Sequence, residues 1–247
     1  MSVHDTYSVS VVIPTRNRLP DLLACVHSLT TQQHLPDEIV ILDSSVCRDT
    51  NRIMEIVKGT NISIRHLYSA PGANLARNRG IEESKGEIIL ILDDDVILDA
   101  GYINEILYVF SSSRDNELGC VTGNILNENQ EKQGMIQTLG NFLLAMFFLP
   151  RSGLGHFQLS GFPTIPSYLN TSTYSSVFPT NNVAIKKEVL EKFKFDERLD
   201  EIISETGVSF RGAGHADDDD ISYRISRKYR IMYDHKAKLI HNKATIT

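Results

Sequence analysis

Hydrophobic residues follow two patterns along this chain: short continuous runs, and longer stretches in which they recur with helical spacing. The run at 9–13 is rich in β-branched residues and ends at Pro14, which predicts a buried strand followed by a loop. Over 19–31 the apolar positions fall on one helical face, which predicts an amphipathic helix. The chain therefore begins with a strand and a helix.

The same alternation continues through the first hundred residues. Apolar runs at 38–42, 62–67 and 87–92 predict further strands, and 49–57 and 74–84 have helical spacing. Continuous apolar strands that alternate with helices are typical of a mostly parallel sheet covered by helices on both faces, an α/β fold. In such sheets ligands bind beyond the carboxyl ends of the strands. The loop from Pro14 to Arg18, Asp43 and the acids at 93–95 would gather there.

The second half has a more mixed pattern. It predicts a helix at 102–110 and a strand at 119–125, and later a strand at 181–185 and helices at 187–193 and 218–229. Two short strands are predicted at 230–233 and 237–241. A long segment, about 127–179, separates the strand at 119–125 from the strand at 181–185. It predicts a functional loop or a short helix at 138–149, because long structureless loops are uncommon inside a domain.

Composition narrows the class of protein. The chain has 247 residues, of which 41% are hydrophobic and 23% charged, which indicates a globular protein. Its net charge of −6 without a basic run argues against nucleic acid as a partner. Three dispersed cysteines indicate neither a disulfide framework nor a cysteine zinc site. The first eight residues resemble no signal peptide, and the apolar block at 142–149 is too short to span a bilayer, so we expect a cytoplasmic protein.

Three consecutive carboxylates, Asp93, Asp94 and Asp95, directly follow the most hydrophobic predicted strand. Such a cluster is costly unless a cation or hydrogen-bond donors compensate its charge. Mg²⁺ and Mn²⁺ take one or two carboxylates and complete their shell with water and phosphate oxygens. The cluster therefore predicts a divalent metal site, with a solvated acidic turn or helix cap as the alternative.

A second acidic cluster, at 217–220, precedes the helical pattern near the end of the chain. Carboxylates are favoured at a helix N-terminus by the helix dipole, so some of these residues are expected to be caps. A transferase also needs a general base for the attacking hydroxyl, which one aspartate at the edge of a pocket can provide. We expect at most one or two of the four to be catalytic.

At this point the chain resembles the family 2 glycosyltransferases, inverting enzymes with the GT-A fold. The segments that carry the resemblance in the first half are Val9-Ser-Val-Val-Ile-Pro-Thr-Arg-Asn-Arg18, Pro36-Asp-Glu-Ile-Val-Ile-Leu-Asp43, Gly72-Ala-Asn-Leu-Ala-Arg-Asn-Arg-Gly80 and Gly86-Glu-Ile-Ile-Leu-Ile-Leu-Asp-Asp-Asp95. In the second half they are Thr180-Asn-Asn-Val-Ala-Ile-Lys-Lys-Glu188, Phe195-Asp-Glu-Arg198 and Asp217-Asp-Asp-Asp-Ile-Ser-Tyr-Arg224. Only about 127–175 lies outside the likeness. The resemblance implies a Rossmann-like mixed sheet and one domain over 1–247, with 1–100 binding the nucleotide-sugar and 101–247 the acceptor.

The resemblance also implies which residues bind the donor. By position, the loop of Pro14, Thr15 and Arg16, together with Asp43, would hold the nucleotide base; a buried Asp43 that caps a loop is the alternative. Arg77 would lie beside the nucleotide and its diphosphate, or else pair on the surface with Glu82 or Glu83. The residue after Asp43 is Ser44, where the family often has a second acid.

Metal, base and acceptor roles follow in the same way. Asp95 would bind the metal directly, Asp93 or Asp94 would contact the ribose, and Asp93 and His241 would complete the Mn²⁺ or Mg²⁺ site; His241 is otherwise a structural residue at a strand end. The pair Asp217 and Asp218 would supply the base, with Asp218 in that role. Asn181 and Asn182 would line the acceptor side, unless they cap the following helix.

These implications define an expected reaction. A hydroxyl acceptor on a glycan, a lipid-linked saccharide or another surface-polysaccharide precursor would receive a sugar from a nucleotide-diphosphate sugar, with UDP-sugars favoured over GDP- or dTDP-sugars. A haloacid-dehalogenase-like phosphohydrolase, a sugar nucleotidylyltransferase and an inactive sugar-binding relative are the alternatives. The apolar block at 142–149 is expected to pack in the core, with peripheral contact with a membrane surface as the second interpretation.

Overall fold

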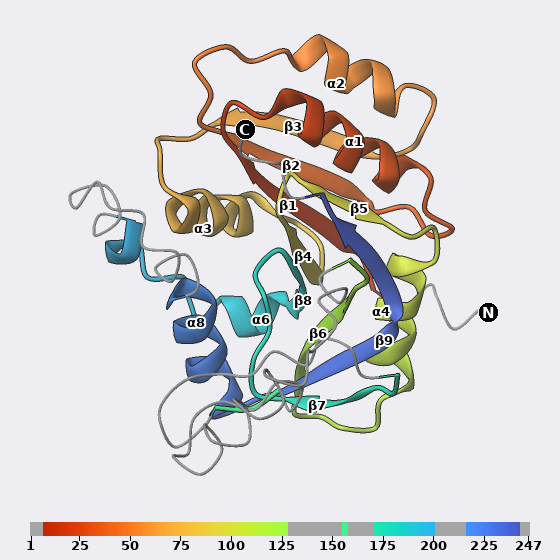
Figure 1. Cartoon of the computed structure of the whole chain (residues 1–247), viewed down its shortest axis with the longest axis vertical. Coiled ribbons are helices and arrows are strands. Elements are labelled where there is room, and N and C mark those ends of the chain that lie inside the picture. The colour runs from red at the N-terminus through yellow and green to blue at the C-terminus, as the bar shows by residue number, and fades with distance from the viewer. Residues whose placement is uncertain (1–6, 128–154, 158–169, 201–215, 243–247) are drawn as a thin grey trace, which may run out of the picture.

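The structure is a computed structural model that describes residues 7–127, 155–157, 170–200 and 216–242. Its centre is a mixed β-sheet with helices on both faces (Figure 1). The strand order is β3-β2-β1-β4-β8-β6-β9-β5, and β7 pairs with β9 beside this path. The mixed α/β sheet predicted from the sequence is therefore confirmed. The predicted helix at 138–149 lies outside the described residues.

The first four strands form the parallel part of the sheet. They are β1 (Val9–Thr15), β2 (Glu38–Asp43), β3 (Ser63–Tyr68) and β4 (Ile88–Leu92), and β1 lies between β2 and β4. Every residue of β2 and β4 is buried, because helices cover both faces. The strand β3 lies at the edge of the sheet and is only partly buried. The carboxyl ends of β1, β2 and β4 consequently point to the same edge of the sheet.

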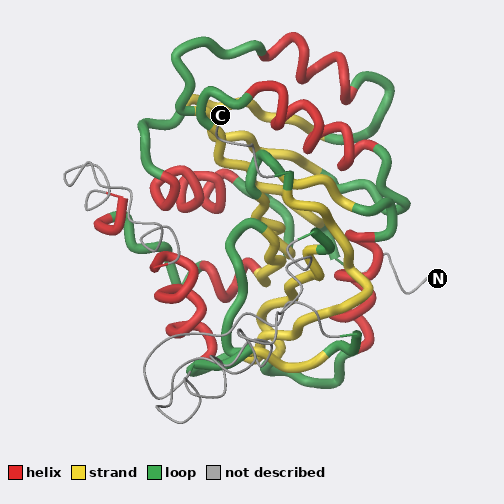
Figure 2. The backbone as a smooth tube through the Cα atoms, in the orientation of Figure 1, coloured by secondary structure: helices red, strands yellow, loops and turns green. Residues whose placement is uncertain are grey.

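Helices divide between the two faces of the sheet (Figure 2). On one face, α1 (Leu19–Thr30), α2 (Thr50–Val57) and α4 (Tyr102–Ser112) share an apolar layer with Val11 and Ile13 of β1. On the other, α3 (Ala73–Glu83), α6 (Lys187–Leu190) and α8 (Ala216–Ser226) share a layer with Val12. The alternation of β1 residues between these layers follows from the two-residue period of a strand.

The second half of the chain adds mostly antiparallel pairings. Its strands are β5 (Val96–Leu98), β6 (Leu118–Ile125), β7 (Thr173–Ser175), β8 (Asn182–Lys186) and β9 (Arg230–His241). β8 is antiparallel to both β4 and β6, while β9 is parallel to β6. The strands predicted at 230–233 and 237–241 are one strand, β9, whose pairing with β6 is irregular where Gly123 pairs with Asp234 and Asn124 with Lys238. The extra residues of that irregularity interrupt the alternating pattern, which is why two strands were predicted.

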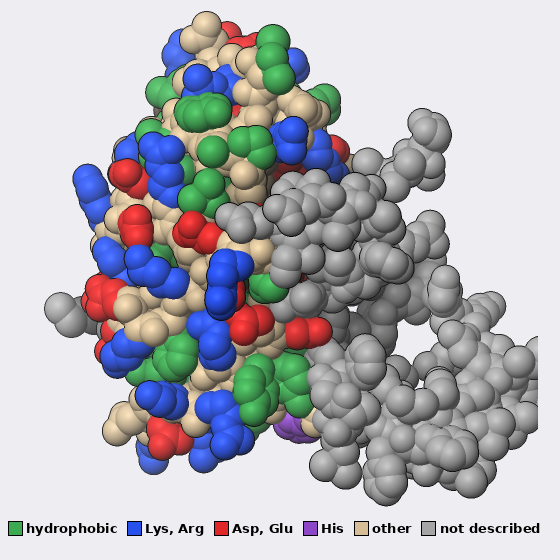
Figure 3. Space-filling model, turned by 90° about the vertical axis from the view of Figure 1, so that its left-hand side faces the viewer, with side chains coloured by type: hydrophobic (Ala, Val, Ile, Leu, Met, Phe, Trp, Pro, Cys, Tyr) green, Lys and Arg blue, Asp and Glu red, His purple; other side chains and the backbone are tan. Residues whose placement is uncertain are grey.

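The described surface is mixed in charge. On the face shown in Figure 3, Lys and Arg side chains lie among Asp and Glu side chains without forming a continuous stripe. Across the described ranges, no helix combines the length and apolar character needed to cross a bilayer. The apolar block at 142–149 lies outside those ranges.

Gly123 lies where β6, β9 and α4 approach most closely. A Cβ at this position would lie 2.5 Å from the backbone oxygen of Ala237 and 2.7 Å from the ring of the buried Tyr102. Neither neighbour can move away easily, so we expect Gly123→Ala to destabilise the fold by about 1–3 kcal/mol. Urea unfolding measures this, with Gly101→Ala as the matched control, since its Cβ would meet only Gln33 Oε1 at 3.9 Å. Equal midpoints for the two variants would contradict the tight packing at Gly123.

Candidate active site

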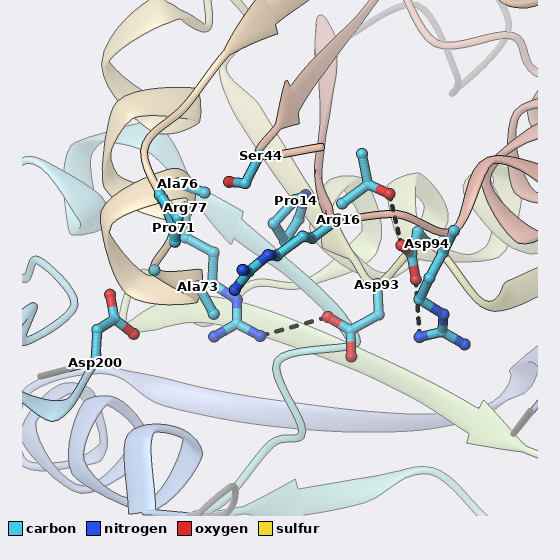
Figure 4. A pocket seen from close by; sticks show the side chains of 13 residues that line it. Pro14, Arg16, Ser44, Pro71, Ala73, Ala76, Arg77, Asp93, Asp94 and Asp200 are labelled. Atoms are coloured by element: carbon cyan, nitrogen blue, oxygen red, sulfur yellow. Dashed lines mark hydrogen bonds and ion pairs between the residues drawn. The ribbon is translucent and has the colours of Figure 1, made fainter. Parts of the chain in front are cut away.

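A cavity of about 690 Å³ lies at the carboxyl ends of the parallel strands. Ligand pockets typically have volumes of this order. Figure 4 shows how side chains from β1, α3 and the turn after β4 surround it. The residues predicted for the donor that line it are Pro14, Thr15, Arg16, Arg77, Asp93 and Asp94. The sheet topology therefore brings these distant positions together.

Asp94 is held on the β1 side of the cavity. Its Oδ2 accepts a hydrogen bond from Thr15 Oγ1 at 2.6 Å, and its Oδ1 lies 3.1 Å from Nη1 of Arg18. Removal from water raises the pKa of Asp94 to about 6, although Thr15 and Arg18 oppose that shift. With these two partners, Asp94 is fixed inside the fold next to the loop that follows β1.

Asp95 pairs with a histidine from the far end of the chain. Its Oδ1 lies 3.1 Å from Nε2 of His241, at the end of β9, and its Oδ2 accepts a hydrogen bond from Arg18 at 2.8 Å. Burial alone would raise the pKa of Asp95, but His241 and Arg18 together lower it. Asn181 lies on the other side of the imidazole, with its Nδ2 3.4 Å from His241 Nδ1. The predicted pair of Asp95 and His241 is thus adjacent in the structure.

Arg77 links the two acidic clusters. Its Nη2 lies 3.4 Å from Oδ1 of Asp93, as Figure 4 shows, and its Nη1 lies 2.7 Å from Oδ2 of Asp217 on α8. The guanidinium group also lies over the ring of Phe195, 5.6 Å from its centre. Arg77 is buried, so neither Glu82 nor Glu83 at the surface is its partner. A buried guanidinium between two carboxylates compensates charges that would otherwise be costly.

Asp218 lies next to this bridge, in the first turn of α8. Its Oδ1 accepts a hydrogen bond from the hydroxyl of Thr180. Removal from water, reinforced by the neighbouring charge of Asp217, raises the pKa of Asp218 to about 7. Among the described residues, Asp217 is paired with the Arg77 guanidinium, whereas Asp218 accepts a hydrogen bond from the neutral hydroxyl of Thr180. Of the two, Asp218 is therefore the better placed to exchange a proton near neutral pH.

Asp43 lies in a second, smaller cavity of about 340 Å³ that shares Thr15 with the first. Both of its carboxylate oxygens have partners within the chain. Oδ1 accepts the backbone N–H of Ser45 at 2.8 Å, and Oδ2 lies 2.8 Å from Nε2 of His66 on β3. The carboxylate is therefore fixed in orientation at the end of β2.

Asn182 is not available to an acceptor. It is completely buried, its Oδ1 accepts hydrogen bonds from Tyr102 and from the backbone of Gly123, and its Nδ2 donates to the Gly123 carbonyl. This side chain fastens β8 to β6 and α4, so its predicted acceptor role is corrected to a structural one. Asn181 lies beside His241, and its predicted acceptor role stays a prediction.

Several residues of the site were given no individual role from the sequence: Arg18, His66, Thr180 and Asp200. Arg18 and Thr180 stand at the ends of segments that resemble the family, so a signal was present. Asp200 accepts the N–H groups of Asn74 and Leu75 at 3.1 and 3.0 Å and so caps α3 across 126 residues of sequence. No local pattern could reveal that contact or the one made by His66.

The residues around Asp95 fit a hard divalent cation. Asp95 Oδ1 and His241 Nε2 face each other, and the buried Oδ1 of Asn181 accepts no hydrogen bond from the residues that the structure describes. Within the described part of the chain, no three His, Cys, Asp or Glu side chains gather closely enough to hold a metal on their own. Mg²⁺ and Mn²⁺ are commonly held by one or two protein carboxylates together with phosphate oxygens and water. The donor set therefore suits a cation that shares its shell with a diphosphate.

Two of the solved structures similar to this one are glycosyltransferases in complex with a nucleotide and a metal. The mannosyltransferase PcManGT from Pyrobaculum calidifontis, with GDP-Man and Mn²⁺, aligns with a TM-score of 0.63 at 16% identity over 97% of this chain and 58% of that one. GalNAc-T7, with UDP, GalNAc and Mn²⁺, aligns with a TM-score of 0.65 at 17% identity over 96% of this chain and 44% of that one. At this level of identity the likeness shows the fold, which is GT-A.

Sequence similarity extends to several relatives and to a family model. The glycosyltransferase GlyG of Streptococcus pneumoniae is 30% identical over 124 residues, which are 49% of this chain and 40% of that protein. A GalNAc(5)-diNAcBac-PP-undecaprenol β-1,3-glucosyltransferase of Campylobacter jejuni is 25% identical over 150 residues, 56% of this chain and 48% of that protein. These alignments span less than half the length of either relative. The family model for glycosyl transferase family 2 matches residues 10–171, about two thirds of the chain. The chain thus belongs to glycosyl transferase family 2.

Proposed function

We propose that this chain is an inverting, metal-dependent glycosyltransferase that moves a sugar from a nucleotide-diphosphate sugar to a hydroxyl group of a saccharide or lipid-linked acceptor. The observation that carries the proposal is the placement of Asp218, a carboxyl group with a pKa of about 7, beside the bridge from Arg77 to Asp93. Membership in family 2 and the donor-sized cavity support it. We also propose that 1–247 acts as one domain, because His241 and Asp218 lie beside the acids that follow β4.

The reaction is a single displacement. The Asp218 carboxylate takes the proton of the acceptor hydroxyl, the hydroxyl oxygen attacks the anomeric carbon, and the bond from that carbon to the diphosphate oxygen breaks. The electron pair of the broken bond leaves with the nucleoside diphosphate. Attack from the face opposite the leaving group inverts the anomeric centre. The proton therefore ends on Asp218, and the negative charge ends on the diphosphate.

Arg77 and Asp217 hold the base side of the site in place. Because Asp217 is fixed to Arg77, the first turn of α8 is tied to α3, and Asp218 is positioned relative to Asp93. The Arg77 charge lowers the pKa of Asp218, while Asp217 raises it. We propose that the buried Arg77 lies next to the donor diphosphate and holds Asp93 and Asp217 in place there.

A divalent cation, Mn²⁺ or Mg²⁺, would be held by Asp95 and His241, with Asp93 as a further carboxylate of the same cluster. When bound, it would supply Lewis-acid stabilisation of the charge on the departing diphosphate. Thr15 and Arg18 fix the position of Asp94. Asp94 would then orient the ribose of the donor. The loop of Pro14 to Arg16 and Asp43 would hold the base.

The chemical class of donor and acceptor rests on relatives. The similar structures contain GDP-Man or UDP, and the Campylobacter relative is named for transfer to a pyrophosphate-linked undecaprenol saccharide. A Bacillus subtilis relative, 30% identical over 89 residues, is named as a putative teichuronic acid glycosyltransferase. We propose a UDP-sugar donor and a surface-polysaccharide precursor as acceptor.

A nucleotide-sugar screen tests the proposal. Thermal unfolding is followed with UDP-, GDP- and dTDP-sugars, each with and without Mn²⁺. A donor at about 100 times its Kd stabilises the native state by about 2.7 kcal/mol. We expect a shift in Tm with at least one donor that requires Mn²⁺, and release of the nucleoside diphosphate once an acceptor is added. If no donor shifts the Tm, the proposed activity is wrong.

The pH dependence of transfer follows from Asp218. Only the ionised carboxylate can accept the hydroxyl proton, so raising the pH through about 7 should increase kcat/KM until it reaches a plateau. Below that pH the rate should fall about tenfold per unit as Asp218 becomes protonated. Initial rates at constant ionic strength and saturating Mn²⁺ measure the profile. A flat profile from about pH 5 to 8 would remove Asp218 as the base.

A further inference from the structure

His66 directly contacts Asp43, the residue proposed to recognise the base. Its Nε2 lies 2.8 Å from Oδ2 of Asp43, and the two side chains are only 3% and 5% exposed. His66 projects from the edge strand β3, and Asp43 ends the neighbouring strand β2. The contact crosses from one strand to the next and is shielded from water.

The other ring nitrogen of His66 is also engaged. Nδ1 lies 2.8 Å from Oγ1 of Thr50, the first residue of α2. A carboxylate can only accept hydrogen bonds, so the proton between the two side chains lies on Nε2 of His66. The Thr50 hydroxyl can donate to Nδ1 or accept from it, so the ring keeps its orientation in either protonation state. The imidazole is thus held from both sides.

Asp43 is consequently restrained as an acceptor. The Ser45 N–H occupies one lone pair of Oδ1 and His66 one of Oδ2, and each carboxylate oxygen has about two. What remains is acceptor capacity only, in a cavity lined also by Thr15, Asn17 and Ser45. A ligand group that hydrogen-bonds to Asp43 must therefore be a donor, such as the N–H of a nucleobase.

We propose that His66 is a positioning residue that sets nucleobase specificity by holding Asp43 as a fixed acceptor. This inference rests on the proposed function and deepens it. Uracil and thymine present N3–H, and guanine presents N1–H and an amino group, so these bases suit the carboxylate. Cytosine can donate from its N4 amino group, but its N3 at the same edge is unprotonated, so a lone pair would face the carboxylate where uracil presents N3–H. The site accordingly selects against cytidine nucleotides.

Calorimetric titration with UDP, GDP and CDP in the presence of Mn²⁺ tests this inference on the full chain. CDP is the matched probe for UDP, because it has the same ribose and diphosphate and differs only at the base edge. Two variants are compared with the unchanged chain. His66→Phe keeps the ring volume and removes both nitrogens, whereas His66→Gln places an amide N–H near the position of Nε2. Circular dichroism and thermal unfolding verify that each variant is folded.

For the unchanged chain we expect UDP or GDP to bind about tenfold or more tightly than CDP, as the loss of a buried hydrogen bond implies. His66→Phe should weaken the preferred nucleotide about tenfold and leave CDP within about twofold, while His66→Gln restores most of the difference. In transfer assays the Phe variant should raise KM for the donor with little change in kcat.

The alternative outcomes separate this inference from the proposed function. If the unchanged chain binds no nucleoside diphosphate, the proposed function fails first. If it binds UDP, GDP and CDP equally, Asp43 does not read the base and the inference is overturned. If His66→Phe weakens UDP and CDP by the same factor, His66 has only a structural role. If His66→Phe binds UDP and GDP as tightly as the unchanged chain does, the inference is also overturned.

Discussion

Asp218→Asn is expected to reduce glycosyl transfer by about 10²–10⁴-fold, the usual contribution of a general base. The amide is close to the carboxylate in size and can still pair with Thr180, so the fold around α8 should be kept. It cannot accept a proton at neutral pH. Donor affinity should stay within a few fold, because no donor-binding role is assigned to Asp218.

The measurement combines initial rates of nucleoside diphosphate release with calorimetric donor binding. Asp220→Asn is the matched control, since Asp220 lies in the same helix but pairs with Arg224 at its surface. That variant should keep nearly full activity. Normal turnover by Asp218→Asn would eliminate Asp218 as the base, and equal losses in both variants would indicate a general effect on α8.

Replacing Asp95 by Asn should produce the second large loss, about 10²-fold or more in transfer, because stabilisation of the leaving diphosphate by a metal contributes several kcal/mol. The asparagine keeps one oxygen but loses the negative charge that faces His241 and Arg18. Chelation by EDTA should cause a similar loss in the unchanged chain, and added Mn²⁺ should reverse it. In the variant, added Mn²⁺ should restore little activity at ordinary concentrations.

Binding of Mn²⁺, followed by electron paramagnetic resonance with and without UDP, tests the site independently of turnover. The Asp95→Asn variant should bind the ion more weakly in both conditions. Asp99→Asn is the control, since Asp99 is an exposed acid a few residues further along the same segment. Unchanged Mn²⁺ affinity in Asp95→Asn would place the cation elsewhere, and activity that is insensitive to EDTA would contradict metal dependence.

The alternative functions considered from the sequence are now less well supported. A haloacid-dehalogenase-like phosphohydrolase places its acids after the first strand, whereas here they follow β4, the fourth strand along the chain. The match to glycosyl transferase family 2 and the GT-A neighbours point in the same direction. An inactive sugar-binding relative would bind a donor without releasing nucleoside diphosphate, and the assays above separate the two.

Much of the fold could be predicted from local pattern. The strands of the parallel half are continuous apolar runs, and the helices between them have clear helical spacing, so β1 to β4 and α1 to α3 were located to within a residue or two. Asp49 caps α2, where its side chain accepts the N–H of Arg52. The three-residue strands β5 and β7 were missed, because so short a run has no periodicity and exists only through pairing with β9.

The candidate site, too, could be predicted from the sequence only in part. Family-like segments and runs of acids, both local features, identified Asp93 to Asp95 and the pair of Asp217 and Asp218 without coordinates. The roles of those residues depend on partners that are distant in sequence. Arg77 meets Asp217 across 140 residues, and Thr180 meets Asp218 across 38.

The amino-acid sequence by itself therefore determined the family, the α/β class and the candidate catalytic and metal-binding residues, because each is encoded in local spacing. Only the tertiary structure decided which of them face one another. In the structure Asp217 pairs with Arg77, and Asp218 accepts a hydrogen bond from Thr180. Asn182 is buried in the core, and His66 contacts Asp43. The physical reason is that hydrogen bonds and ion pairs between side chains depend on separation in space, which the crossing of strands and helices sets and the local pattern does not.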